Sequence, residues 1–205
     1  SLVMNYKTEQ EEFWAKEFGN DYISRNQNYI SNIPFFSKVI SKTFNIKSVI
    51  EFGCNIGLNL KALNILLPEC KLTGVEINNN ACQFLQEWGK CNVINKSIFN
   101  YSESRKYDLS MIKGVLIHIN PDMLESVYAK LYDSSNKYIL IAEYYNPTPV
   151  SISYRGHNDR LFKRDFAGEM LDKYNDLRLT DYGFLYHRDN YFLQDDINWF
   201  LLEKS

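Results

Sequence analysis

Two short stretches of the chain combine residue types that suit a nucleotide-like ligand. Residues 48–59 read as a buried apolar strand, a turn that contains Gly53 and Gly57, and the start of a helix. Residues 72–78 form a second apolar run with Glu76 near its end. Glycine has no Cβ and lets the backbone approach a ligand closely, and a carboxylate accepts hydrogen bonds from a ribose diol. This order of elements is typical of a nucleotide site at the carboxyl edge of a parallel sheet: a strand, a glycine turn, a helix, and a second strand that ends in an acidic residue.

The spacing of the glycines discriminates between cofactors. A dinucleotide site has the pattern G-x-G-x-x-G and places the pyrophosphate at a helix N-terminus. Here Gly53 and Gly57 are separated by three residues, and Glu51 precedes the first glycine by two. A carboxylate at that position repels a pyrophosphate and suits a ligand with an ammonium group, which disfavours an NAD-type oxidoreductase. The alternative is that this segment binds no ligand and is only a tight turn between a strand and a helix.

The segment from Glu51 to Gly57 resembles motif I of the class I S-adenosylmethionine (SAM) methyltransferases, written E/D-x-G-x-G-x-G. Asn55 departs from the central glycine of that motif, but asparagine tolerates left-handed backbone angles better than most residues. The resemblance implies SAM as the cofactor. It also implies an α/β fold with a Rossmann-like, seven-stranded, mostly parallel sheet, helices on both faces and an antiparallel C-terminal strand pair. The positions that it assigns to the cofactor are Tyr22, Arg25, Glu51, Gly53, Asn55, Gly57, Glu76, Ile77, Ser97, Ile98 and Lys113.

Within that set, the resemblance gives four residues particular roles. Tyr22 and Arg25 would meet the methionine carboxylate, which an arginine fork suits. Ser97 and Ile98 would lie beside the adenine, although many relatives carry an acid at this turn. The alternatives are a solvated surface Arg25 and an ordinary strand end at residues 97–98.

Two histidines are candidates for acid–base chemistry. His118 lies in the segment that follows the apolar run 107–113, and the methyltransferase resemblance places that segment beside both methyl donor and acceptor. A neutral imidazole near pH 7 can take a proton from an acceptor hydroxyl. His157 lies in a second polar segment. The alternative is that His118 packs the loop and takes no part in proton transfer.

A local excess of cations follows the apolar run 137–143, although the whole chain has a net charge of −2. Arginine and lysine here suit a carboxylate or phosphate on an acceptor. A solvated loop with internal pairs to Asp159 and Asp165 is the alternative. The candidate substrate-binding residues in and before this segment are Tyr144, Tyr145, Tyr154, Arg155 and Arg160, and Lys163 and Arg164 add to the positive charge.

Hydrophobic periodicity predicts the elements that hold these residues. We expect strands over residues 48–52, 72–77, 107–113 and 137–143, a short one near 92–100, and a C-terminal pair over 178–186 and 198–203. Helices are expected over residues 31–46, 59–67, 78–89 and 166–174 and from Pro121 onward. A further helix that starts at Thr8 and ends at Gly19 would be part of an N-terminal lid over residues 4–30.

Composition limits the class of protein. At 205 residues the chain fits one domain over 1–205, with residues 1–3 read as a cloning remnant before Met4. The net charge argues against a dedicated nucleic-acid binder, and no apolar run approaches the ~18–20 residues of a membrane span. The four cysteines form no C-x-x-C pair, so we expect no metal site and reduced thiols in a cytoplasm.

A closer resemblance runs over nearly the whole chain. Residues 9–15, 113–121, 143–149 and 154–157 look like the small methylases that accompany pseudaminic acid biosynthesis in bacteria. That kinship implies a small anionic acceptor, either a nonulosonic acid or a nucleotide-linked sugar precursor, in surface-glycan biosynthesis. The alternatives are a SAM-binding regulator of the same pathway without catalysis, and a methyltransferase for another small metabolite.

Overall fold

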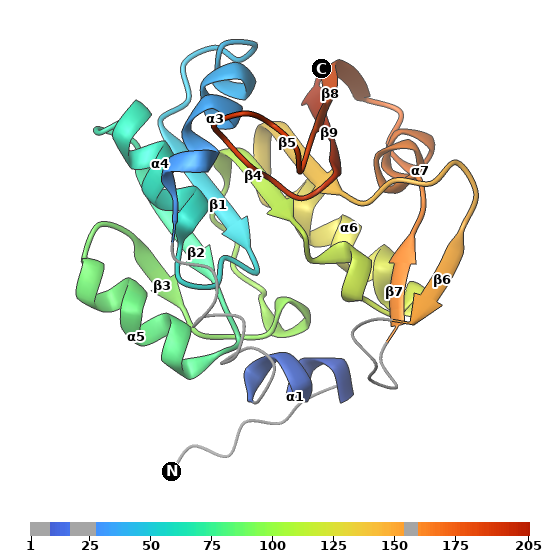
Figure 1. The fold of residues 1–205 in the computed structure, drawn as a ribbon, viewed down its shortest axis with the longest axis horizontal. Helices are drawn as coiled ribbons and strands as arrows, with labels where there is room; N and C mark the ends of the chain where they lie inside the picture. Colours follow the sequence, from blue (N-terminus) through green and yellow to red (C-terminus); the bar gives the residue numbers. More distant parts are fainter. Residues whose placement is uncertain (1–8, 17–27, 154–159) are drawn as a thin grey trace.

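The computed structural model describes residues 9–16, 28–153 and 160–205 (Figure 1). Its main element is a seven-stranded sheet in the order β3-β2-β1-β4-β5-β9-β8. The neighbouring pairs from β3 through β5 are parallel, whereas β9 is antiparallel to both β5 and β8. The predicted sheet and its antiparallel C-terminal pair are therefore confirmed. The strands are β1 (Ser48–Phe52), β2 (Lys71–Val75), β3 (Asn92–Ile94), β4 (Tyr107–Lys113), β5 (Ser135–Glu143), β8 (Leu177–Leu185) and β9 (Ile197–Lys204).

Helices cover both faces of the sheet (Figure 1). One face packs against α3, α4 and α5, and the other against α6 and α7. The short helix α1 lies beyond the carboxyl ends of β1 and β2 (Figure 1). The helices are α1 (Glu9–Ala15), α3 (Ile33–Ile40), α4 (Leu58–Leu66), α5 (Asn79–Trp88), α6 (Leu124–Asp133) and α7 (Phe166–Lys173), with 3₁₀ turns η1 (Ile30–Asn32), η2 (Ile98–Asn100), η3 (Leu116–His118) and η4 (Pro121–Met123).

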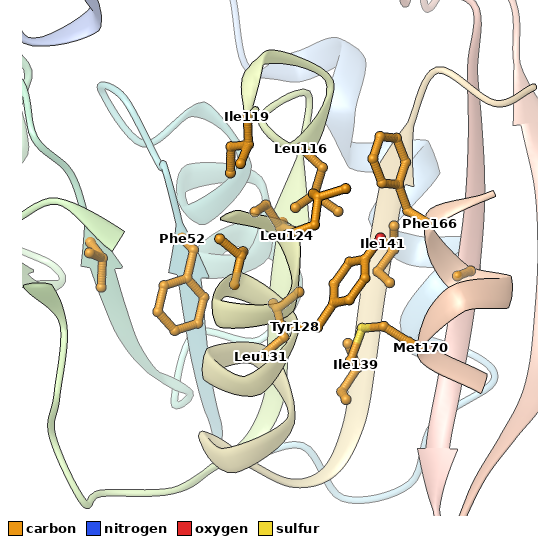
Figure 2. Close-up of a cluster of buried hydrophobic side chains, with 14 of the residues drawn as sticks. Phe52, Leu116, Ile119, Leu124, Tyr128, Leu131, Ile139, Ile141, Phe166 and Met170 are labelled. Carbon is orange, nitrogen blue, oxygen red and sulfur yellow. The ribbon is translucent and has the colours of Figure 1, made fainter. Parts of the chain in front are cut away.

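The central strands are apolar because both of their faces are buried. Ile50 and Phe52 point to the face covered by α6 and α7, while Val49 points to the face covered by α3 and α4. Figure 2 shows the first of these cores, to which α6 contributes Leu124, Tyr128 and Leu131, and α7 contributes Phe166 and Met170. A rigid sheet with filled cores on both sides holds the strand ends in place, and those ends position the site.

The strand order reverses between β1 and β4, since β2 and β3 continue on one side and β5 on the other. At such a switch point the loops after the two central strands diverge to opposite faces and leave a crevice at the carboxyl edge. The fold therefore provides a ligand crevice between the glycine turn after β1 and the loop after β4.

The structure differs from the predictions in three segments. The helix expected to end at Gly19 ends at Ala15 as α1. No strand was predicted between residues 144 and 165, but Val150–Ser153 (β6) and Arg160–Lys163 (β7) pair as an antiparallel ribbon. The helix expected over 31–46 ends at Ile40 as α3, and Asn45 has a positive φ of 61° that is incompatible with a continuing helix. In α3, the backbone geometry after Ile40 overrode the apolar periodicity.

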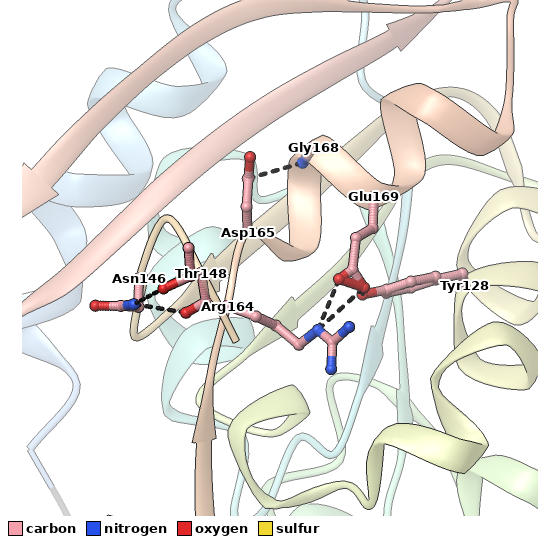
Figure 3. Close-up of polar contacts among 7 residues, drawn as sticks. All are labelled: Tyr128, Asn146, Thr148, Arg164, Asp165, Gly168 and Glu169. Carbon is pink, nitrogen blue, oxygen red and sulfur yellow. Dashed lines mark hydrogen bonds and ion pairs between the residues drawn. The ribbon is translucent and has the colours of Figure 1, made fainter. Parts of the chain in front are cut away.

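A polar cluster fixes the start of α7 and the chain before it (Figure 3). The Asp165 carboxylate accepts the Gly168 N–H at 2.9 Å as an N-cap, and Arg164 Nε donates to Glu169 Oε2 at 2.6 Å. Tyr128 of α6 donates its hydroxyl to the same Glu169 carboxylate. These contacts join α6 to α7.

None of the helices in the described ranges has the length and apolar character needed to cross a bilayer. The same residues contain no group of three histidine, cysteine or acidic side chains that could hold a metal ion.

Candidate functional site

A cavity of about 590 Å³ lies at the carboxyl edge of the sheet, at the switch point between β1 and β4. That volume is within the range of about 300–1,000 Å³ that small-molecule sites occupy. Its walls come from segments far apart in the chain: α1, the turn η1, the loops after β1, β2, β3 and β4, and the loop before β9. Among the predicted residues, those that line it are Gly53, Asn55, Glu76, Ile77, Ser97, Ile98, Lys113, His118 and Tyr144.

Left-handed backbone angles build the glycine turn after β1. Gly53, Asn55 and Gly57 have φ values of 73°, 51° and 84°. A Cβ on Gly53 would lie 2.6 Å from Val115 Cγ2, and one on Gly57 would lie 2.4 Å from Leu85 Cδ2. The two glycines are therefore required by both conformation and packing, and Asn55 adopts the left-handed angle that asparagine tolerates.

Glu76 ties this turn to the end of β2. Its Oε1 accepts the Asn55 N–H at 2.8 Å and its Oε2 accepts the Asn78 N–H at 2.7 Å. Burial raises the pKa of Glu76, while the backbone N–H groups act in the opposite direction. The carboxylate keeps free lone pairs toward the cavity that it lines, so it can still accept hydroxyl donors.

Glu51 and Gly57 lie behind the lining residues. Glu51 is 1% exposed, and Asn59 Nδ2 donates to its Oε2 at 2.7 Å. Among the described residues its Oε1 has no hydrogen-bond partner. Burial raises the pKa of Glu51 to about 8, against the Asn59 hydrogen bond and the charge of Lys113. A buried acceptor without a donor is a position that a ligand ammonium would stabilise.

The loop after β3 supplies the far end of the cavity. Ser97 is buried and its hydroxyl accepts the Phe99 N–H at 3.1 Å, which fixes the start of η2. Ile98 follows it on the cavity wall. Hydrophobic walls with backbone polar groups suit a flat heterocyclic ring.

Helix α1 closes one side of the cavity. The Asn78 side chain donates to the carbonyl oxygens of Trp14 and Ala15 at 3.2 and 3.0 Å. Trp14 and Glu11 line the cavity, and the Trp14 ring lies 4.7 Å from the His118 ring, centroid to centroid. The described part of the expected N-terminal lid therefore contacts the ends of both β2 and β4.

A buried carboxylate anchors the loop that leads to His118. Glu143, the last residue of β5, accepts the N–H groups of Val115 and Leu116 at 2.9 and 2.8 Å. These residues lead into η3, which ends at His118. His118 is 6% exposed, and burial lowers its pKa to about 4. The imidazole is therefore neutral at pH 7, and its protonated form loses the proton more readily than an ordinary imidazolium.

The predicted acceptor residues do not all reach the cavity. Tyr144 lines it, and Lys163 Nζ lies 5.4 Å from the centre of the Tyr144 ring. Tyr145 turns toward Phe200 on the outer part of the sheet, and Arg160 at the start of β7 is exposed and outside the lining. Arg164 is engaged by Glu169.

Five predicted residues lie outside the described ranges: Tyr22, Arg25, Tyr154, Arg155 and His157. Sequence reasoning also missed four residues that shape the site, namely Asn59, Asn78, Glu143 and Gln194. Asn78 was detectable as the N-cap of α5, since its side chain accepts the Ala81 N–H. The others act through contacts between distant segments and have no local signal.

Comparison with known proteins identifies the fold of the chain but does not assign the chain to a family. No family model matches the sequence, and no curated protein matches it. Among solved structures, magnesium protoporphyrin IX methyltransferase from Synechocystis PCC 6803 with bound SAM has a TM-score of 0.67 at 13% identity, over 98% of this chain and 100% of that one.

Two more structures agree with the first. The 1,6-didemethyltoxoflavin-N1-methyltransferase from Burkholderia thailandensis has a TM-score of 0.67 at 12% identity, over 91% of this chain and 82% of that one. A SAM-dependent methyltransferase from Clostridium acetobutylicum has a TM-score of 0.63 at 13% identity, over 92% and 98% of the two chains. The chain therefore has the fold that SAM-dependent methyltransferases with different substrates share.

Proposed function

We propose that the chain is a SAM-dependent methyltransferase that acts on a small molecule. The observation that carries the proposal is the junction of the glycine turn with Glu76 on the wall of the cavity. This junction lies at the switch point of a sheet whose fold is shared with SAM-dependent methyltransferases. Glu51 argues against a pyrophosphate there, and hence against an NAD-type oxidoreductase.

The residues present fit the parts of SAM. Glu76 would accept the ribose hydroxyls, and the wall at Ser97 and Ile98 would take the adenine. Glu51 lies behind the Gly53 wall, where the ammonium would favour ionisation of the buried carboxyl group and pair with it. Lys113 completes this end of the cavity, and Tyr22 and Arg25 stay candidates for the carboxylate.

Bound SAM would supply a methyl group on a sulfonium, which passes to an acceptor nucleophile as the sulfur–carbon bond breaks. Positioning of the acceptor contributes most of the acceleration in such a transfer. The imidazole of His118 would take the acceptor proton, but with its pKa near 4 it is a weak base at pH 7. An amine or an acidic acceptor group needs less help from it than a sugar hydroxyl.

For the acceptor, we propose a small anionic molecule of the sugar type, in bacterial surface-glycan biosynthesis. Support comes from the resemblance to the methylases of pseudaminic acid biosynthesis and from Lys163, which lies over the Tyr144 ring beside the cavity.

We expect the reaction in the cytoplasm, where the four cysteines, all free in the structure, stay reduced. The weak basicity of His118 favours one second candidate, a SAM-binding regulator without turnover.

Calorimetric titration with S-adenosylhomocysteine, NAD and ATP tests the cofactor. We expect selective binding of S-adenosylhomocysteine. Glu76→Gln should weaken it, because the new amide group faces the N–H of Asn55 or Asn78. The matched control is Glu87→Gln on the exposed side of α5, which should bind normally. Preferential binding of NAD would overturn the proposal.

A second experiment tests the acceptor. Methyl transfer from labelled SAM is measured with nonulosonic acids, nucleotide sugars and uncharged sugars. Lys163→Glu should raise KM for anionic acceptors and leave S-adenosylhomocysteine binding unchanged. Binding of the cofactor without turnover on any acceptor would favour the regulator.

A further inference from the structure

A chain of hydrogen-bonded amide side chains leads from the loop before β9 to Glu51. Gln194 Nε2 donates to Asn32 Oδ1 at 2.7 Å and to the Ser31 carbonyl at 2.8 Å. Asn32 Nδ2 donates to Asn59 Oδ1 at 2.9 Å, and Asn59 Nδ2 donates to Glu51 Oε2 at 2.7 Å. Four segments, at residues 194, 31–32, 59 and 51, are joined in this way.

Every link of this chain points in the same direction. Each amide donates through its nitrogen to the next acceptor, Asn32 and Asn59 also accept through their oxygens, and the last donor meets the carboxylate. Aligned dipoles of this kind strengthen one another, and a donor to a carboxylate favours its ionised form. The chain therefore opposes the effect of burial on Glu51.

The chain also closes the cavity. Asn32, Asn59 and Gln194 all line it, and Asn32 is buried. The loop that carries Gln194 is 162 residues from Asn32 in sequence. It has little regular structure of its own, so these contacts set its position against η1.

We infer that Gln194, Asn32 and Asn59 are positioning residues for Glu51, and that the loop before β9 is thereby part of the cofactor site. The inference rests on the proposed function, because the ligand group concerned is the ammonium at the amino-acid end of the cofactor. The chain orients the Glu51 carboxyl group behind the Gly53 wall and favours its ionisation, so that this ammonium and the carboxylate stabilise each other when the cofactor binds.

Other titratable groups face Glu51 as well. Lys113 at the end of β4 favours its charged form, whereas Glu76 after β2 disfavours it. The thiols of Cys54 and Cys91 interact with Glu51 electrostatically. The pKa values of the two thiols are raised, so both stay neutral, whereas burial lowers the pKa of Lys113. A change with pH is therefore assigned to Glu51 by comparing a variant with the unmodified protein, in which Lys113 and the other carboxyl groups are the same.

The test compares two ligands in Gln194→Met. S-Adenosylhomocysteine carries the amino-acid end, and 5′-methylthioadenosine lacks it. We expect about 3- to 10-fold weaker binding of S-adenosylhomocysteine at pH 7, the size of one lost hydrogen bond, with 5′-methylthioadenosine unchanged. Asn59→Leu removes the donor to Glu51 itself and should lose at least as much. Gln86→Met on the exposed surface of α5 is the matched control.

The pH dependence of ligand binding distinguishes residues that position Glu51 from residues that only cover the cavity. Without the chain, the pKa of Glu51 rises further, so the variant loses affinity most at pH 6–7 and recovers toward pH 9. Equal weakening of both ligands, or a loss independent of pH, would overturn the inference and leave the proposed function standing. Failure of the unmodified protein to bind S-adenosylhomocysteine would overturn both.

Discussion

The cavity has two walls, and they are built in different ways. The β1–β2 wall consists of the glycine turn and Glu76, and its shape comes from left-handed backbone angles within a few residues of each strand. The β4–β5 wall consists of Val115–His118, Glu143 and Tyr144. There, one carboxylate at the end of β5 holds two N–H groups that are 27 and 28 residues away in sequence.

This difference matters for function. A wall made from backbone geometry is rigid and presents the same N–H and C=O groups whatever the side chains are, which suits a constant cofactor. A wall held by side-chain contacts can change its lining without changing the fold.

The largest effect should come from the carboxylate of the β4–β5 wall. Glu143→Ala leaves the buried N–H groups of Val115 and Leu116 without their acceptor, so we expect the free energy of unfolding to fall by about 3–5 kcal/mol. Urea denaturation followed by circular dichroism measures it. Glu143→Gln keeps a carbonyl acceptor and should cost less than about 1 kcal/mol. Similar losses in the two variants would show that this wall does not depend on the contact.

The glycine turn should be the next most sensitive. Gly53→Ala should lower the free energy of unfolding by about 1–3 kcal/mol, because residue 53 has a φ of 73° and the new Cβ would lie 2.6 Å from Val115. Gly114→Ala is a matched control, because its φ is 69° and nothing lies within 4 Å of the new Cβ. It should show only the backbone cost, about 1 kcal/mol. If both variants unfold at the same urea concentration, close packing does not add to the cost.

Glu51 and His118, one beside each wall, should have opposite effects on the pH dependence of stability. The folded pKa of Glu51 is about 8 against an ordinary 4.5, so the folded state binds the proton more tightly and stability falls as pH rises from about 4.5 to 8. The folded pKa of His118 is about 4 against 6.5, so its contribution to stability is lost as pH falls from about 6.5 to 4. Each slope is at most about 1.4 kcal/mol per pH unit.

Urea unfolding between pH 4 and 9 measures these slopes. Glu51→Gln should reduce the slope on the alkaline side, to which Glu143 also contributes because burial raises its pKa to about 7. His118→Asn should flatten the acidic side, and neither substitution should change the slope that belongs to the other. If each substitution changed the opposite side of the profile, the assignment of the two slopes to Glu51 and His118 would be wrong.

The smallest effect concerns the cluster beside the β4–β5 wall. Arg164→Met removes a partly buried ion pair with Glu169 (Figure 3) and should lower stability by about 0.5–1.5 kcal/mol. Arg178→Met removes an equally short pair with Glu203 whose arginine side chain is 68% exposed, and should cost about 0–0.5 kcal/mol. Equal costs would mean that burial does not strengthen the first pair.

The β1–β2 wall was predictable from the sequence because its determinants are local. The apolar runs that end at Phe52 and near Glu76, the two glycines, and the tolerance of Asn55 for a left-handed angle all act within one strand and turn. The same local periodicity predicted the strands of the main sheet and its antiparallel C-terminal pair. These parts need only short-range sterics and the alternation of buried and exposed residues.

Tertiary structure alone decided the rest. Glu143 read as the end of an apolar strand, and only the register of β5 beside β4 places its carboxylate under the loop that carries His118. The β6–β7 ribbon and the amide chain from Gln194 to Glu51 depend on contacts between segments that no local pattern relates. Sequence periodicity reports which face of an element is buried, whereas the partner of a polar group is known only when distant segments have folded together.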